Sequence, residues 1–191
     1  GPTPDSIAEL MKLGVDAWLA KQFATPPTAY PAPNDTGEGV GRLQDAFFTN
    51  ALTGQDQLRQ RVAFALSEIF VVSATKDTRF AQMAPYMTLL SNNAFGKVRP
   101  LMEAVTKNPS MGYFLDMVNN DKANPAKNTV ANENYARELL QLFTLGLVML
   151  NPDGTPQQNS PPVYDESTVK DLAKVFPGYA FPKERQPRLF A

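Results

Sequence analysis

The residues best suited to chemistry lie on one predicted helix, NTVANENYARELLQLFTLGL at residues 128–147. Glu133 and Arg137 are four residues apart with the acid first, which is the favourable order for an ion pair along a helix. Glu138 adds a second carboxylate. Two carboxylates beside a guanidinium suit acid/base catalysis or the binding of an oxyanion. The same three residues also suit an ordinary ion pair with an acid near a helix start, so the spacing leaves both interpretations open.

A second charged pair lies on a predicted helix over residues 55–73, which is apolar around most of its circumference. Arg61 and Glu68 are seven residues apart and therefore share a side of that helix. A buried charge must be paired, and such a pair either fixes how helices dock or binds a polar ligand in a cleft. We expect Arg61 or Glu68 to pair with Glu133 or Arg137 across two packed helices.

Residue types exclude several classes of site. The chain has no histidine and no cysteine, which removes a Ser-His-Asp triad, an imidazole base and thiolate or imidazole metal ligands. The oxygen-rich stretch 119–134, with Asp116 and Asp121 nearby, lacks the regular acidic spacing of an EF-hand calcium loop. We therefore predict no metal and no cofactor.

Charge and hydropathy limit the partners. Eighteen Lys and Arg residues stand against 19 Asp and Glu residues, for a net charge of -1. Without a positive excess the chain is not expected to bind nucleic acid. The longest uncharged apolar run, residues 139–152, is too short and too polar to cross a bilayer, so no transmembrane segment is predicted. The expected partner is the remainder of the same polypeptide or another protein.

The elements that would position these residues are helices. The 17 prolines fall where helices begin or where the chain passes between them. The sequence predicts an all-α, irregular multi-helix domain with Pro-rich connecting loops over residues 1–179, followed by a tail, 180–191, that leads to a missing C-terminal part. Roughly seven to nine helices are expected, over residues 3–13, 15–23, 43–52, 55–73, 85–90, 98–106, 110–118, 128–147 and 167–175.

The predicted core is built from residues 55–73, 98–106 and 132–146. Leu66 and Ile69 of the first segment should be fully buried, because an all-round apolar helix is typically central. On the third segment, spacings of four, seven and eight residues place four side chains on one buried stripe. These are Tyr135, Leu139, Leu142 and Phe143. Gly146 should end that helix, and Asn151–Gly154 should form a turn.

Several stretches together resemble one protein family. They are GPTPDSIAELMKLGVDAWLAKQF at the start, DQLRQRVAFALSEIFVVS at 56–73, AFGKVRPLMEAVTKNPSMGYFLD at 94–116, NENYARELLQLFTLGLVMLNPDGT at 132–155 and YDESTVKDLAKVFPGYAF at 164–181. This pattern is similar to the bacterial DUF1800 family. The resemblance implies a large, often exported bacterial protein without an established activity, of which this chain would be the N-terminal part.

Two classes of function remain open from the sequence. The first is a non-catalytic structural or interaction domain of an exported protein. The second is a hydrolase that uses carboxylates as acid and base. The absence of histidine and cysteine favours the first class. A deep cleft lined by Glu133, Arg137 or Glu68 would favour the second.

Overall fold

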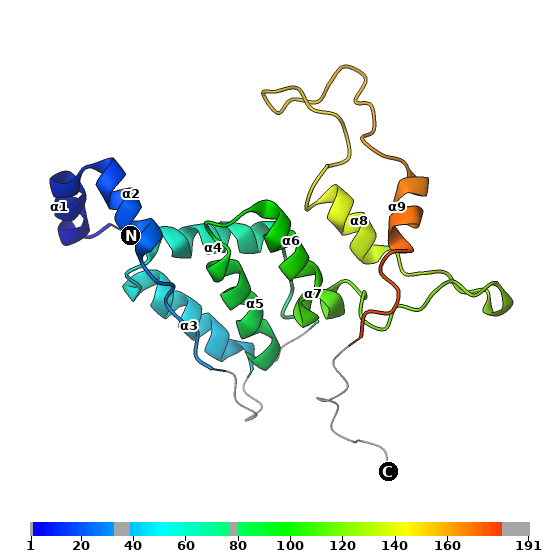
Figure 1. Ribbon diagram of the computed structural model, residues 1–191, viewed down its shortest axis with the longest axis horizontal. Helices are drawn as coiled ribbons and strands as arrows, with labels where there is room; N and C mark the ends of the chain where they lie inside the picture. The colour runs from blue at the N-terminus through cyan, green and yellow to red at the C-terminus, as the bar shows by residue number, and fades with distance from the viewer. Residues whose placement is uncertain (1, 33–38, 77–79, 181–191) are drawn as a thin grey trace, which may run out of the picture. The chain divides into compact units, whose positions relative to one another are not determined.

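The fold is all-α, as predicted. A computed structural model describes residues 2–32, 39–76 and 80–180, and this part of the chain contains nine α-helices and no named strand (Figure 1). The helices are α1 (Pro4–Leu13), α2 (Val15–Ala24), α3 (Val40–Thr53), α4 (Gln57–Ile69), α5 (Phe80–Asn92), α6 (Val98–Thr106), α7 (Pro109–Phe114), α8 (Asn134–Gln141) and α9 (Glu166–Ala173), with a short 3-10 helix, η1, at Pro125–Lys127.

The chain forms two compact units. The first covers residues 1–106 with α1 to α6, and the second covers 107–191 with α7 to α9. Compact halves occur within one domain as well as in two, so the single domain over 1–179 stays a prediction. Nearly all of the predicted tail, 180–191, lies outside the described residues.

Local capping chemistry explains where several helices begin. Thr3 and Ser6 form a reciprocal capping box at α1, with Ser6 N donating to Thr3 Oγ1 over 3.2 Å and Pro4 in the first turn. Asn108 accepts from Ser110 N at the start of α7, and Asp165 accepts from Thr168 N at the start of α9. The α7 cap is therefore Asn108, two residues before the predicted start at Ser110, which is itself buried.

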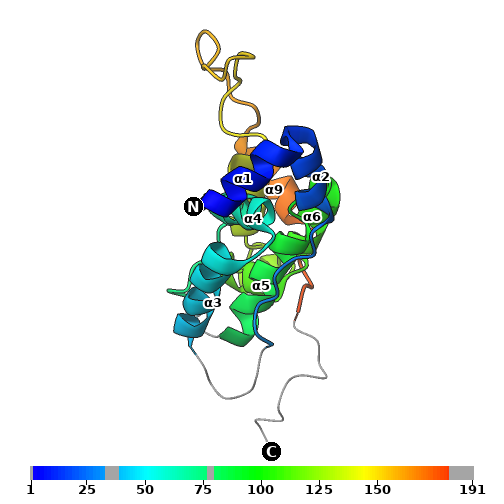
Figure 2. The ribbon, with the colours of Figure 1, turned by 90° about the vertical axis from the view of Figure 1, so that its left-hand side faces the viewer.

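The central helix of the first unit is α5. It packs against α3, α4 and α6 (Figures 1 and 2). Tyr86 and Leu90 on it are fully enclosed. The Tyr86 hydroxyl donates to Phe70 O over 2.5 Å, which satisfies a carbonyl at the end of α4. The remaining buried apolar residues of this unit are Leu43, Ala46, Ala63, Phe70, Met83, Ala84, Leu101 and Val105.

The predicted full burial of Leu66 and Ile69 on α4 is wrong, although α4 does pack against α2, α3 and α5. Ile69 is 48% exposed, and Leu66 is only half-buried. The side that α4 buries carries Arg59, Gln60 and Ala63 instead. When apolar residues surround a helix, the sequence does not reveal which side is covered. Here two polar side chains that have hydrogen-bond partners, Arg59 and Gln60, lie on the covered side.

The helix predicted over 128–147 is much shorter. α8 covers only Asn134–Gln141, because the amide groups of Leu145 and Gly146 both donate to Leu140 O and so widen the last turn. Gly146 does end this segment, with a φ of 79°. The predicted buried stripe is half correct. Tyr135 and Phe143 are buried, Leu139 is half-buried, and Leu142 is 59% exposed.

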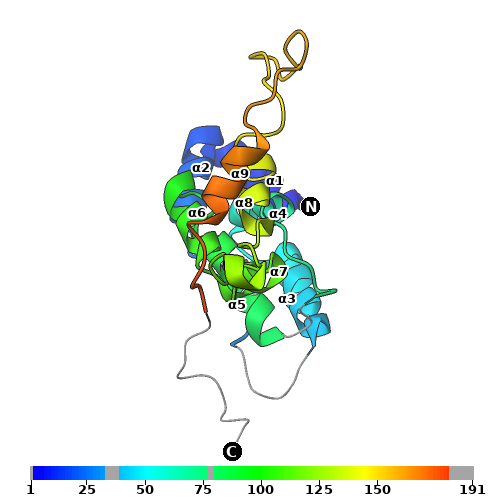
Figure 3. The same cartoon turned by 90° about the vertical axis from the view of Figure 1, so that its right-hand side faces the viewer.

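A long irregular ribbon, residues 147–163, joins the end of α8 to the start of α9 within the second unit. Figures 2 and 3 show it extending away from both helices. Two isolated bridges, Val148 to Pro162 and Leu150 to Pro156, hold its two sides together. The predicted turn at its tip is confirmed by a hydrogen bond of 2.9 Å from Gly154 N to Asn151 O.

Candidate functional site

The charged residues singled out on α8 form an ion cluster with α9. Arg137 Nη2 lies 3.1 Å from Glu133 Oε2, one turn earlier, and 2.7 Å from Glu166 Oε1. Arg137 Nη1 also donates to Glu166 Oε2 over 3.0 Å, so the guanidinium grips the Glu166 carboxylate with both nitrogens. The guanidinium thus ties two helices that pack side by side (Figure 3).

Local sequence places Glu166 at this point. Asp165 caps α9 and makes Glu166 the first residue of the helix, where the positive end of the helix dipole favours an acid. Hydrogen bonds from Ser167 and Thr168 lower the pKa of Asp165 to about 2. Glu166 is 29 residues from Arg137, and no spacing in the sequence connects them, so the sequence reasoning missed it.

The electrostatics of this cluster favour permanently charged groups. The hydrogen bond from Arg137 holds the pKa of Glu166 below its ordinary value, and the bond to Glu166 raises the pKa of Arg137. The side chains of Arg137 and Glu166 remain 38% and 55% exposed. A general acid needs a carboxyl whose pKa is raised towards neutrality, which this arrangement does not provide.

Glu138 behaves differently from its neighbours. Its Oε2 atom is buried and has no hydrogen-bond partner among the residues that the structure describes, and the same holds for the hydroxyl of Tyr164. Buried polar atoms without partners are rare in folded proteins. Glu138 is therefore the one predicted catalytic candidate with an unexplained carboxylate oxygen.

The two candidates on α4 are exposed. Arg61 donates to Gln57 Oε1 over 3.3 Å and lines a groove of about 730 Å³ in the first unit. Within the described part of the chain, neither Arg61 nor Glu68 forms an ion pair. The second ion-pair partner of Arg137 is Glu166 of α9. The predicted pairing of Arg61 or Glu68 with Glu133 or Arg137 would involve residues of both units, and it stays a prediction.

A buried polar cluster around Asp56 was missed by the sequence reasoning. The Asp56 side chain is fully buried just before α4, and it accepts from Thr28 N at 2.9 Å, Thr28 Oγ1 at 2.5 Å and Gln60 Nε2 at 3.0 Å. Burial alone would raise the pKa of Asp56, but these hydrogen bonds outweigh it and lower the pKa. The sequence signal that could have drawn attention to Asp56 is its position just before a helix. Its side chain does not cap α4, however, and instead binds the distant loop at Thr28.

Gly54 is required by the same cluster. A Cβ atom at Gly54 would lie 2.6 Å from Asn50 O and 2.9 Å from both Asp56 Oδ1 and Thr28 Oγ1. Only glycine therefore allows the loop around Thr28 to approach the start of α4 so closely. This arrangement holds the loop segment around Thr28 in place, and Asp56 itself is fully buried.

Arg59 is a buried cation supported by carbonyl groups and an aromatic ring. Its Nη1 donates to Ser91 O over 3.0 Å, and its guanidinium carbon lies 4.5 Å from the centre of the Phe95 ring. Arg59 Nε and Ser91 Oγ are buried without partners among the described residues. These contacts tie the end of α5 to α4.

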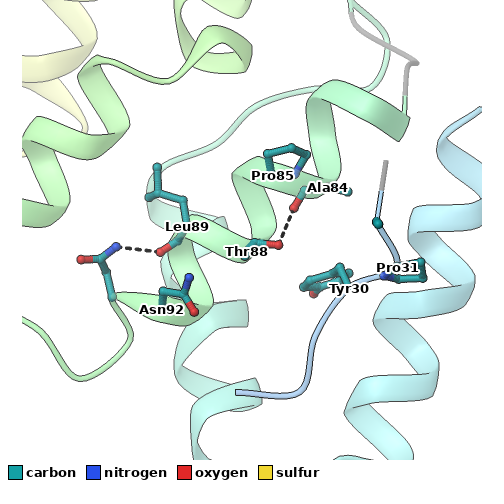
Figure 4. A pocket seen from close by; sticks show the side chains of 9 residues that line it. Tyr30, Pro31, Ala84, Pro85, Thr88, Leu89 and Asn92 are labelled. Atoms are coloured by element: carbon teal, nitrogen blue, oxygen red, sulfur yellow. Dashed lines mark hydrogen bonds between the residues drawn. The ribbon is translucent and has the colours of Figure 1, made fainter. Parts of the chain in front are cut away.

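A second cavity lies between the loop at Tyr30 and Pro31 and the side of α5. It measures about 480 Å³, and Ala84, Pro85, Thr88, Leu89 and Asn92 contribute to its wall (Figure 4). Thr88 Oγ1 donates to Ala84 O and Asn93 Nδ2 donates to Leu89 O, so part of its polar lining is already engaged (Figure 4). Burial, with the Asp56 charge, raises the pKa of Tyr30 to about 12. The lining carries no charge, and none of the predicted site residues belongs to it.

Over the residues described, no group of three or more acidic side chains is placed to hold a metal ion. In the same ranges, no helix has both the length and the apolar character to cross a membrane.

Comparison with known proteins establishes the family. The sequence model of the family described as "Protein of unknown function (DUF1800)" matches residues 1–191. The chain belongs to the DUF1800 family. Searches of curated proteins and of solved structures found no match. The family description of this DUF1800 chain names no activity, so its function has to be inferred from its own residues.

Proposed function

We propose that this DUF1800 chain is a structural and interaction domain of an exported protein. The observation that carries the proposal is the cluster of Glu133, Arg137 and Glu166, in which Arg137 links α8 to α9 with two hydrogen bonds to Glu166 and makes a third to Glu133 at the start of α8. The hydrogen bond from the guanidinium lowers the pKa of Glu166 and so favours its charged form. Such a cluster holds two helices together and is poorly suited to proton transfer.

The placement of the other candidates supports the same proposal. A deep cleft lined by Glu133, Arg137, Glu138 or Glu68 would have favoured catalysis. None of these four residues lines either of the two cavities described above. The export part of the proposal is supported by the family resemblance alone. Fractionation of cells that produce the tagged full-length protein tests it, and recovery of the protein only in the cytoplasm would contradict it.

The alternative, a hydrolase that uses carboxylates, has one supporting observation. Glu138 Oε2 and Tyr164 OH are buried and unpartnered among the described residues of the same unit. Unsatisfied buried polar atoms are sometimes retained for catalysis. Glu138 is therefore the residue on which the two functions give different expectations.

The deciding experiment compares the purified protein with the variants Glu138→Gln, Glu133→Gln and, as a control on a solvent-exposed acid, Asp45→Asn. Each is assayed against chromogenic esters, peptides and glycosides and is then unfolded in urea. A structural role predicts no turnover that depends on Glu138, together with changed stability for the two α8 variants. Turnover that disappears in Glu138→Gln while the folded state is retained would support the hydrolase instead.

A further inference from the structure

The groove lined by Arg61 is bounded by α1, α2, the end of α3 and the start of α4, all in the first unit. Its apolar lining comes from four elements that bring large side chains to one place. These are Ile7 and Leu10 of α1, Trp18 of α2, Leu52 of α3 and Leu58 of α4. Ile7 is 46% exposed and Leu52 is 74% exposed. The first unit therefore leaves a substantial apolar surface open at this groove.

Helix α1 lacks the burial that normally stabilises a helix. It has a complete capping box at its start, yet none of its ten residues is buried. Its apolar residues are Ile7, Leu10, Met11 and Leu13, and Met11 is 81% exposed. Isolated helices of this length are marginal in water, so an amphipathic helix with an uncovered apolar side gains stability when a partner covers it.

The two walls of the groove carry opposite charges, which suit a partner that has both an acidic and a basic side chain. Lys21 of α2 and Glu9 of α1 satisfy each other in an ion pair. Arg61 on the α4 wall and Asp5 on the α1 wall are exposed, and neither forms an ion pair within the described ranges. One positive and one negative charge are thus left on opposite walls, with apolar surface between them.

The secondary structure of the groove favours a helical occupant. Helices α1, α2 and α4 and the junction at 52–55 line it, and no strand edge is among them. An extended segment would find few backbone partners there, whereas a helix satisfies its own backbone groups and needs only side-chain contacts. A helix with an apolar side flanked by an acid and a base matches both walls.

We propose that this groove is a docking site for an amphipathic helix of a partner protein, with an acidic residue facing Arg61 and a basic residue facing Asp5. The inference rests on the proposed interaction function and names the kind of partner. The test of that function uses variants of α8 in the other unit, so either proposal can fail while the other holds.

The experiment uses the full 191-residue chain and the fluorescence of Trp18, which is its single tryptophan and lines the groove. The probe is a synthetic helical peptide of about 15 residues, without tryptophan, with leucines at i, i+3, i+4 and i+7, glutamates along one flank and lysines along the other. We expect a saturable blue shift of the Trp18 emission. A peptide of the same composition with leucines distributed around the helix should give none.

Charge variants test the orientation of the contacts. Arg61→Glu should weaken binding of the probe about tenfold, because it places like charges against each other. The variant should then prefer a peptide with lysines on both flanks. Arg99→Glu, on the exposed side of α6 and outside the groove, is the matched control and should leave binding unchanged.

Three results would overturn the proposal. The first is equal binding of the ordered and the rearranged peptides, which would indicate non-specific apolar contact. The second is unchanged affinity in Arg61→Glu with both peptides. The third is a dimer in analytical ultracentrifugation that Ile7→Asp dissociates, with no binding of either peptide, which would show that a second copy of the chain occupies the groove.

Discussion

Individual buried polar residues organise the part of the first unit around the start of α4. Asp56 and Gln60 are buried around the start of α4. Gln22 of α2 reaches the same region, where its Oε1 atom accepts a hydrogen bond of 3.0 Å from Leu58 N. Each buried group has a specific partner, as burial of polar groups requires. The chain uses these contacts to fix the loop between α2 and α3 against α4.

Replacing Asp56 by asparagine should destabilise the protein by about 2–3 kcal/mol. All three partners of the carboxylate are donors, so the amide group of asparagine would face one of them. Because the pKa of Asp56 is lowered in the folded state, its charge contributes stability above the ordinary value of 3.8, and this contribution is lost as the pH falls through the folded pKa. Urea unfolding at pH 7 and pH 3 should therefore show a smaller difference between wild type and variant at pH 3. A difference independent of pH would contradict this account, and Asp45→Asn serves as an exposed control.

Arg137→Ala should cost only about 1 kcal/mol, because the ion cluster on α8 and α9 is partly exposed and screened by solvent. The 3–5 kcal/mol expected for a desolvated inter-helix pair does not apply at this exposure. A double-mutant cycle between Arg137 and Glu166, read by urea unfolding, should give a small favourable coupling energy, as is typical of exposed ion pairs. The coupling should fall when salt is added. A coupling of zero would show that the cluster does not hold the helices together.

At the scale of elements, the starts of α1, α2 and α6 agree with the prediction to within one residue, whereas α5 begins five residues earlier and α8 six residues later than predicted. The start of α1 is visible in local sequence because Thr3 caps the helix through its neighbour Ser6. Burial depends on which side of a helix meets another helix, and no local signal reports that. The Glu133–Arg137 pair was predictable from its spacing, whereas Glu166, Asp56 and Arg59 depend on segments that are distant in sequence.

The position of α5 at the centre of the first unit gives a direct test. Leu90→Ala should cost about 2–5 kcal/mol, because Leu90 is fully enclosed. Ile69→Ala on α4 should cost less than about 1 kcal/mol, because that side chain is half exposed. Chemical denaturation of the two variants provides the comparison. Equal losses would show that Ile69 contributes as much to the core as Leu90 and would contradict this account.

At the scale of the whole molecule, each unit has its own buried apolar residues. Those of the second unit are Met111, Leu115, Met117, Ala131, Tyr135, Ala136, Phe143, Val169, Ala173 and Phe176. Tyr135 and Phe176 meet edge to face, with ring centres 5.0 Å apart. The sequence predicted a helical fold but not a boundary between two units at residues 106–107. The nearby Asn108-Pro109 is also typical of an ordinary helix start, so it does not indicate a linker.

Residues 1–106 expressed alone should therefore fold. Their central residues, Tyr86, Leu90 and Val105, are enclosed and belong to that unit. We expect a helical circular dichroism spectrum and a cooperative urea transition. A spectrum of unfolded chain, or a gradual loss of helix without a transition, would show that the first unit depends on the second for its stability.

The ribbon at 147–163 has a consequence for solubility. It exposes Leu147 and Leu150, each more than half accessible, on an extended arm, which is the kind of edge that recruits further strands and seeds fibres. Pro156 and Pro162 occupy the two bridge positions and have no N–H to donate to an incoming strand. The prolines thus let the arm stay extended while blocking the growth of a sheet along it. Replacing both by threonine should make the protein aggregate with thioflavin T fluorescence, and an unchanged soluble protein would show that the arm is protected in another way.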